Sequence, residues 1–133
     1  MKYILINNGG ALQKDIKKYL LLFSLITLPF HFVMGREFIS KEEAHRLVNK
    51  EKALLLDVRT SVEFAIKHID GAKRVSVSEL QKEIKTIEKW AGGKDKPIVI
   101  YCMSGGRASS AEDQLIKAGF KKVYNLGGIM RWY

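Results

Sequence analysis

Two short, uninterrupted apolar runs set the strongest limit on how this chain can fold. Residues 53–58 (ALLLDV) and 97–101 (PIVIY) each have the length of a strand, and neither alternates between apolar and polar side chains. A strand without such alternation is covered on both faces, which is typical of a parallel sheet between two layers of helices. The runs therefore predict the centre of a parallel sheet.

The segments around these runs carry helix and turn signals. Capping boxes, in which Ser or Thr is followed three residues later by Glu or Gln, predict three helix starts: Ser40 with Glu43, Thr60 with Glu63, and Ser78 with Gln81. We expect these helices to end near residues 48, 67 and 91, a fourth helix at about 108–118, and short strands at 37–39, 75–77 and 123–126. The alternation predicts an α/β fold of three layers, a parallel β-sheet flanked by helices.

The chain divides into two parts of different composition. Residues 19–34 are mostly apolar and follow Lys17 and Lys18, a pattern typical of the hydrophobic region of a signal peptide. We expect residues 1–35 to be a signal peptide or a membrane anchor, and residues 36–133 to be one domain of ordinary size. The predicted location is the periplasm or another place outside the cytoplasm, with cleavage or tethering through residues 19–34 left open.

The net charge is strongly positive but spread along the chain. There are 23 basic and 14 acidic side chains, giving +9, and the longest basic runs are pairs such as 73–74 and 121–122. A nucleic-acid interface needs basic side chains clustered on one face with stacking aromatics. We therefore expect no nucleic-acid partner, and a positive field that attracts small anionic substrates.

The single cysteine, Cys102, follows directly after the run at 97–101. Ligands of open parallel sheets bind beyond the carboxyl ends of the strands, so its sulfur is expected at the mouth of the sheet. Gly105 and Gly106 let the next backbone N–H groups turn inward, and together with a helix N-terminus they form an anion cradle that favours a thiolate. A lone cysteine excludes an intrachain disulfide and a Cys-x-x-Cys metal site, and we expect no metal or cofactor. The alternative is an inert buried cysteine.

Four ordered motifs resemble those of one known family, the rhodanese-type sulfurtransferases. The loop at 101–108 (YCMSGGRA) resembles the family's active-site loop, in which a cysteine is followed by four residues and often an arginine. The other three are an aspartate strand end with its short helix, a His-Ile-x-Gly-Ala turn and a closing Gly-Gly-x-x-x-Trp, found here at 57–64, 68–72 and 127–132. The resemblance covers about residues 36–133 and implies the family's α/β fold.

The resemblance also implies a reaction and a set of site residues. Cys102 would take a sulfane sulfur from thiosulfate or a persulfide and pass it to a thiol or to cyanide, through a Cys102 persulfide. The partners would thus be a small anionic sulfur donor and a thiol or cyanide acceptor, with no cofactor. The loop residues expected to bind substrate are Met103, Ser104, Gly105, Gly106 and Arg107, and the expected supporting residues are Asp57, Arg59 and His68.

Several alternatives remain open at this level. Arg107 would either attract the donor anion or pair with a carboxylate and shape the loop. We expect Asp57, Arg59 and Glu63 to form a structural polar cluster under the site rather than to take part in the reaction. We expect His68 to stabilise a turn rather than to act as a base. The rival function is a rhodanese-like module that carries sulfur or docks a partner without turnover. A phosphatase is disfavoured, because related phosphatases need five residues between cysteine and arginine, and this loop has four.

Overall fold

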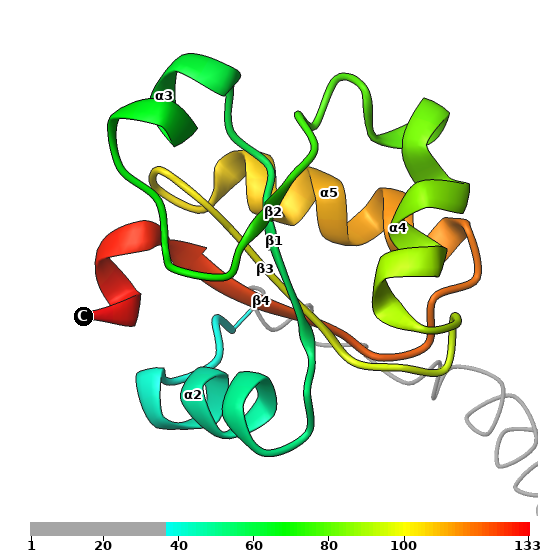
Figure 1. Cartoon of the computed structure of the whole chain (residues 1–133), viewed down its shortest axis with the longest axis horizontal. Helices are drawn as coiled ribbons and strands as arrows, with labels where there is room; N and C mark the ends of the chain where they lie inside the picture. Colours follow the sequence, from blue (N-terminus) through cyan, green and yellow to red (C-terminus); the bar gives the residue numbers. More distant parts are fainter. Residues whose placement is uncertain (1–36) are drawn as a thin grey trace, which may run out of the picture. The chain divides into compact units, whose positions relative to one another are not determined.

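Helices and strands alternate along residues 37–133, the part of the chain that the computed structural model describes (Figure 1). Two of the helices are short 3-10 helices, η1 and η2. In chain order the elements are α2 (Lys41–Asn49), β1 (Leu54–Asp57), α3 (Ser61–Ile66), β2 (Lys73–Arg74), η1 (Leu80–Glu83), α4 (Ile84–Ala91), β3 (Ile98–Cys102), α5 (Gly106–Lys117), β4 (Val123–Gly128) and η2 (Ile129–Trp132).

The four strands form one parallel sheet in the order β2-β1-β3-β4. The two apolar runs provide its central strands, β1 and β3, with Leu56 opposite Ile100. On the side of β3 that pairs with β4, Cys102 lies opposite Gly128. The predicted parallel sheet is confirmed, and its central strands are buried along their whole length.

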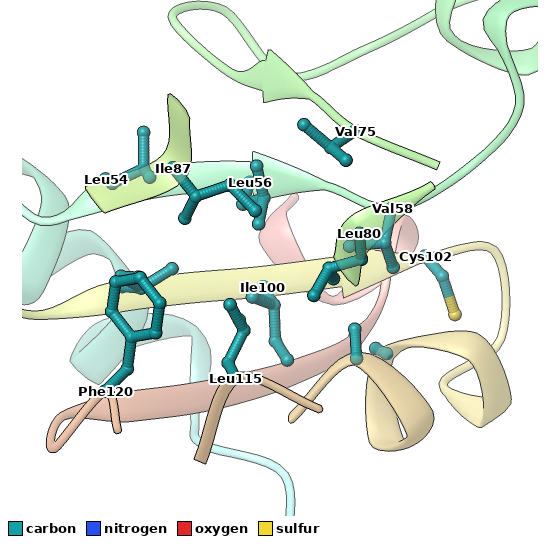
Figure 2. Close-up of a cluster of buried hydrophobic side chains, with 13 residues drawn as sticks. Leu54, Leu56, Val58, Val75, Leu80, Ile87, Ile100, Cys102, Leu115 and Phe120 are labelled. Atoms are coloured by element: carbon teal, nitrogen blue, oxygen red, sulfur yellow. The ribbon is translucent and has the colours of Figure 1, made fainter. Parts of the chain in front are cut away.

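Successive side chains of β1 and β3 enter two separate cores. On one face, Leu56 and Ile100 pack with Ile87 of α4 and Leu115 of α5 (Figure 2). On the other face, side chains from the same strands pack with α2 and η2; this second core contains Leu55, Val99, Tyr101, Ala44, Leu47 and Ile129. Helices cover both faces, which confirms the predicted three layers and explains why neither run alternates.

Two of the three predicted capping-box sites begin helices, but only Thr60 and Glu63 form the complete box, because the Glu43 carboxylate bonds to Arg46. At the start of α2 the Ser40 hydroxyl accepts the Glu43 N–H at 3.1 Å. At the start of α3 the Thr60 hydroxyl accepts the Glu63 N–H at 3.3 Å, and a Glu63 carboxylate oxygen accepts the Thr60 N–H at 3.0 Å. These bonds satisfy backbone donors that have no partner within the helix.

Three local predictions were wrong. The third capping box does not form, because the chain makes a turn at 76–79, with the Glu79 N–H bonded to Ser76 O at 2.9 Å, and the helical segment begins only at Leu80, as η1. The strand expected at 75–77 lies two residues earlier, as β2. Residues 37–39 form no strand, since Ser40 already caps α2 and the Ile39 N–H makes a single bond to Asn125 O at 2.9 Å.

The predicted signal peptide or membrane anchor at 1–35 lies outside the described residues, so it stays a prediction, as does the periplasmic location. Among the helices of residues 37–133, none is long and apolar enough to cross a membrane.

Candidate active site

Cys102 is the last residue of the central strand β3, at the carboxyl edge of the sheet. Its side chain is 1% exposed and belongs to the core between the sheet and helices α4 and α5. Figure 2 shows it at one end of that core, beyond Val58 and Leu80, with the sulfur toward the loop that leads into α5. The strand therefore delivers the thiol to the position where parallel sheets bind ligands.

The loop after Cys102 returns one of its backbone N–H groups to the sulfur. The Gly105 N–H donates to Cys102 Sγ at 3.0 Å, and α5 begins at the next residue, Gly106. A backbone donor and the N-terminus of a helix both favour negative charge on the sulfur. Of the backbone donors expected to form the cradle, the Gly105 N–H is the one that bonds to the sulfur in the described structure.

Close packing explains the glycines around the loop. Gly105 has a left-handed φ of +112°, and a Cβ there would lie 2.6 Å from Cζ of Phe38. A Cβ on Gly128 would lie 2.6 Å from the Met103 carbonyl oxygen. The loop is therefore held between the Phe38 ring and the end of β4, with no room for side chains at either glycine.

Arg107 ties the start of α5 to α3. Its Nη1 and Nη2 donate to the two carboxylate oxygens of Glu63, each at 2.7 Å. Hydrogen bonding to this guanidinium holds the pKa of Glu63 well below its usual range, and the same bonds raise the pKa of Arg107. Of the two roles predicted for Arg107, this contact is the pairing with a carboxylate that shapes the loop.

Asp57 and Arg59 form a buried ion pair at the end of β1. Their side chains are 0% and 2% exposed, and Arg59 Nη2 donates to Asp57 Oδ2 at 2.7 Å. The same nitrogen donates to the Lys67 carbonyl at 2.6 Å. Hydrogen bonding to Asp57 raises the pKa of Arg59. The pair joins the sheet to the chain after α3, so two members of the expected polar cluster, Asp57 and Arg59, meet, while the third, Glu63, pairs with Arg107.

His68 lies on the exposed turn that follows α3. Its Nδ1 is 2.8 Å from the Phe64 carbonyl oxygen, and its ring stacks on Phe64 with centroids 3.8 Å apart. Both contacts stabilise the turn. Within residues 37–133, no group of three or more His, Cys, Asp or Glu side chains is placed to hold a metal ion.

Sequence spacing did not predict two features of the site. Glu63 and Arg107 are 44 residues apart, and no local pattern indicates that they meet. An apolar groove of about 210 Å³ beside the loop is lined in part by Ile66, Met103 and Met130, which come from three separate elements. Only the fold brings these side chains together.

A buried thiol at the carboxyl end of a central parallel strand, followed by a tight glycine loop and a helix N-terminus, defines a class of α/β proteins with a cysteine loop at the edge of the sheet. Within that class, the sequence model of the Rhodanese-like domain matches residues 40–133. This chain belongs to the rhodanese-like domain family, which confirms the resemblance.

Two similar curated proteins differ in how much of them this chain covers. Thiosulfate sulfurtransferase GlpE of Coxiella burnetii is 35% identical over 95 residues, which are 71% of this chain and 84% of that protein. A tRNA uridine(34) hydroxylase of Buchnera aphidicola is also 35% identical over 95 residues, but this chain spans only 29% of its length.

Solved structures share the fold. The human single-domain sulfurtransferase TSTD1 is 25% identical, with a TM-score of 0.62 over 74% of this chain and 95% of that one. A rhodanese-related protein from Thermoplasma volcanium is 26% identical, with a TM-score of 0.60 over 73% of this chain and 90% of that one. This chain covers at least nine-tenths of each of these two structures, of which one is named a sulfurtransferase and the other a rhodanese-related protein.

Proposed function

We propose that this protein is a sulfurtransferase in which Cys102 carries a sulfane sulfur from thiosulfate or a persulfide donor to a thiol or cyanide acceptor. The observation that supports this most directly is the Gly105 N–H at 3.0 Å from Cys102 Sγ, at the point where β3 ends and α5 begins. Family membership and the similarity to thiosulfate sulfurtransferase GlpE support the same reaction class.

The first step loads the sulfur onto the protein. The Cys102 thiolate attacks the outer sulfur of thiosulfate, a new S–S bond forms, and the original S–S bond breaks. Sulfite leaves with the bonding electron pair, so no external oxidant or reductant is needed. Backbone donors of the loop at 103–107, which include the Gly105 N–H, would hold the terminal sulfur of the Cys102 persulfide as an anion.

The second step returns the thiolate. Cyanide or an acceptor thiolate attacks the terminal sulfur, the Cys102 S–S bond breaks, and thiocyanate or the acceptor persulfide leaves. Cys102 recovers the electron pair as a thiolate, which the same N–H donor and the start of α5 stabilise. His68 is not required as a base, because an anionic nucleophile has no proton to remove.

The residues around the thiol bear on the choice of donor. Met103, directly after the cysteine, carries no charge, and both terminal nitrogens of Arg107 are bonded to Glu63. Neither side chain offers an unpaired cation to a thiosulfate dianion. A persulfide donor therefore fits this loop as well as thiosulfate does.

Intact-mass analysis of the full chain after incubation with thiosulfate tests the proposal. We expect a gain of one sulfur atom, its loss with thiocyanate formation when cyanide is added, and no gain in Cys102→Ser. A gain only with a thiol persulfide would assign that donor class. No gain with either donor would overturn the proposal.

A second candidate function is a sulfur carrier or partner-binding module that does not turn over. The 1% exposure of Cys102 favours it, because small molecules in solution reach a buried thiol slowly, which limits repeated turnover. Repeated thiocyanate formation separates the two functions: an enzyme forms many equivalents per chain, and a carrier forms one.

A further inference from the structure

The helix α3 has an apolar side that is mostly exposed in the described domain. None of its six residues is buried, and its two large aliphatic side chains, Val62 and Ile66, are 67% and 81% exposed. They are four residues apart, so they lie on the same side of the helix. A short helix that is exposed on its apolar side is costly in water unless something covers it.

This apolar side adjoins the active-site loop. Ile66 lines the groove of about 210 Å³ together with Met103 of the loop and Met130 of η2. Met103 and Met130 are themselves 47% and 68% exposed. Figure 1 shows α3, the loop after β3 and η2 gathered at the end of the sheet where β3 and β4 terminate.

Of the three charged side chains that border the groove, Arg59 and Glu63 are already paired, and Lys67 is exposed. Arg59 is bonded to Asp57 and to the Lys67 carbonyl, and Glu63 is bonded to Arg107. These ion pairs neutralise the charges of Arg59 and Glu63, so the contacts that the groove can make with a ligand are mainly apolar. Methionine side chains suit such a role, because they adapt their shape to different apolar partners.

We propose that this groove binds a large apolar side chain of an acidic protein that accepts sulfur from Cys102. In that partner the apolar side chain lies next to the cysteine that receives the sulfur. The inference rests on the proposed sulfur transfer and names the class of its acceptor. A volume of about 210 Å³ admits a side chain but not a whole ligand of drug size. The apolar surface continues beyond the groove to Val62, which only a partner larger than a small thiol can cover.

Charge complementarity defines the rest of the partner. The chain carries +9, and Lys67, which lines the groove, is exposed and has its Nζ 4.4 Å from the Tyr133 ring centroid. An acidic partner is attracted by this field, whereas a basic one is repelled. Once docked, the partner's thiolate attacks the terminal sulfur of the Cys102 persulfide, and the electron pair of the broken S–S bond returns to Cys102.

Three peptide acceptors provide the test, with the full chain loaded as its persulfide. Asp-Leu-Cys-Leu-Asp and Asp-Ser-Cys-Ser-Asp differ only in the apolar side chains, and Lys-Leu-Cys-Leu-Lys reverses the charge. We expect the first to accept sulfur about 5-fold to 10-fold faster than the second, because one leucine is partly buried, and several-fold faster than the third. Equal rates for all three peptides would overturn the proposal.

Variants of exposed side chains locate the effect. Ile66→Ser and Met130→Ser are each expected to reduce the preference for leucine over serine to less than about 2-fold. Ile116→Ser is the matched control, because Ile116 is 54% exposed on α5 and does not line the groove, so the preference should remain. Transfer to cyanide, which is too small to use the groove, should be unchanged in all three variants.

These readouts separate the two proposals. Failure of the wild-type chain to form a persulfide overturns the sulfur-transfer function itself. Normal thiocyanate formation with a leucine preference that survives in both Ile66→Ser and Met130→Ser overturns the groove alone.

Discussion

At the scale of single residues, Gly105 occupies a position with no room for a side chain. Its φ of +112° is unfavourable for any L side chain, and a Cβ would lie 2.6 Å from Cζ of Phe38. Gly105→Ala combines backbone strain with overpacking, so we expect it to lower the free energy of unfolding by about 2–3 kcal/mol. Urea unfolding followed by circular dichroism measures this loss.

The neighbouring glycine is the control for that experiment. A Cβ on Gly106 would meet nothing within 4 Å, and Gly106 opens α5, so Gly106→Ala is expected to cost no stability. Adding Phe38→Ala to Gly105→Ala should give a less than additive loss, since the ring that the new methyl group meets is gone. Equal losses in Gly105→Ala and Gly106→Ala would contradict this account of the loop.

The buried ion pair gives a second residue-scale prediction. Asp57→Asn leaves the 2% exposed Arg59 guanidinium without its countercharge, and we expect a loss of about 3–5 kcal/mol in the free energy of unfolding. The exposed pair of Asp95 and Lys121 spans a comparable 2.9 Å, but its side chains are 77% and 72% exposed. Asp95→Asn should therefore leave the unfolding midpoint unchanged, and similar shifts in both variants would show that burial is not the cause.

At the scale of elements, α3 depends on Glu63, which completes its capping box and pairs with Arg107. The pKa of Glu63 is lowered in the folded chain from its ordinary value of 4.5, first by its hydrogen bonds to Arg107. A lowered carboxyl pKa stabilises the fold above the unfolded-state pKa, and that stability is lost as the pH falls through the folded-state pKa. Because the pair is partly exposed, Glu63→Gln should cost only about 1 kcal/mol at pH 7.

Thermal unfolding from pH 7 to pH 3 checks this origin. The gap in melting temperature between wild type and Glu63→Gln should narrow as the pH falls below about 4.5, since the unfolded wild-type chain then binds a proton at Glu63 that the folded chain, with its lowered pKa, does not. Thr60→Ser, which keeps a hydroxyl at the cap, is expected to retain the wild-type pH profile. A gap that stays constant over the whole range would show that the carboxylate charge is not responsible.

The same elements show how far sequence reasoning reaches. Long apolar runs and capping boxes at 40–43 and 60–63 are local signals, and they predicted β1, β3, α2 and α3 near their observed bounds. The third capping box failed because the backbone makes a turn at 76–79 and the helical segment begins two residues after Ser78. The position of Cys102 followed from the parallel sheet, but the groove did not, because Ile66, Met103 and Met130 meet only after folding.

At the scale of the whole molecule, the prediction concerns the field that a charge of +9 creates around the single thiol. Iodoacetate and iodoacetamide both alkylate Cys102, but only iodoacetate is an anion, so the ratio of their rates reports the local potential. We expect this ratio to fall about 2-fold to 5-fold as the salt concentration rises from 0.02 to 0.3 M, because ions screen the field. N-acetylcysteinamide, a thiol without neighbouring positive charges, should show no such fall. If the ratio of the iodoacetate rate to the iodoacetamide rate at Cys102 did not change with salt, the net charge of the chain would not attract anions to the thiol. Any preference for anionic donors would then arise in the loop itself.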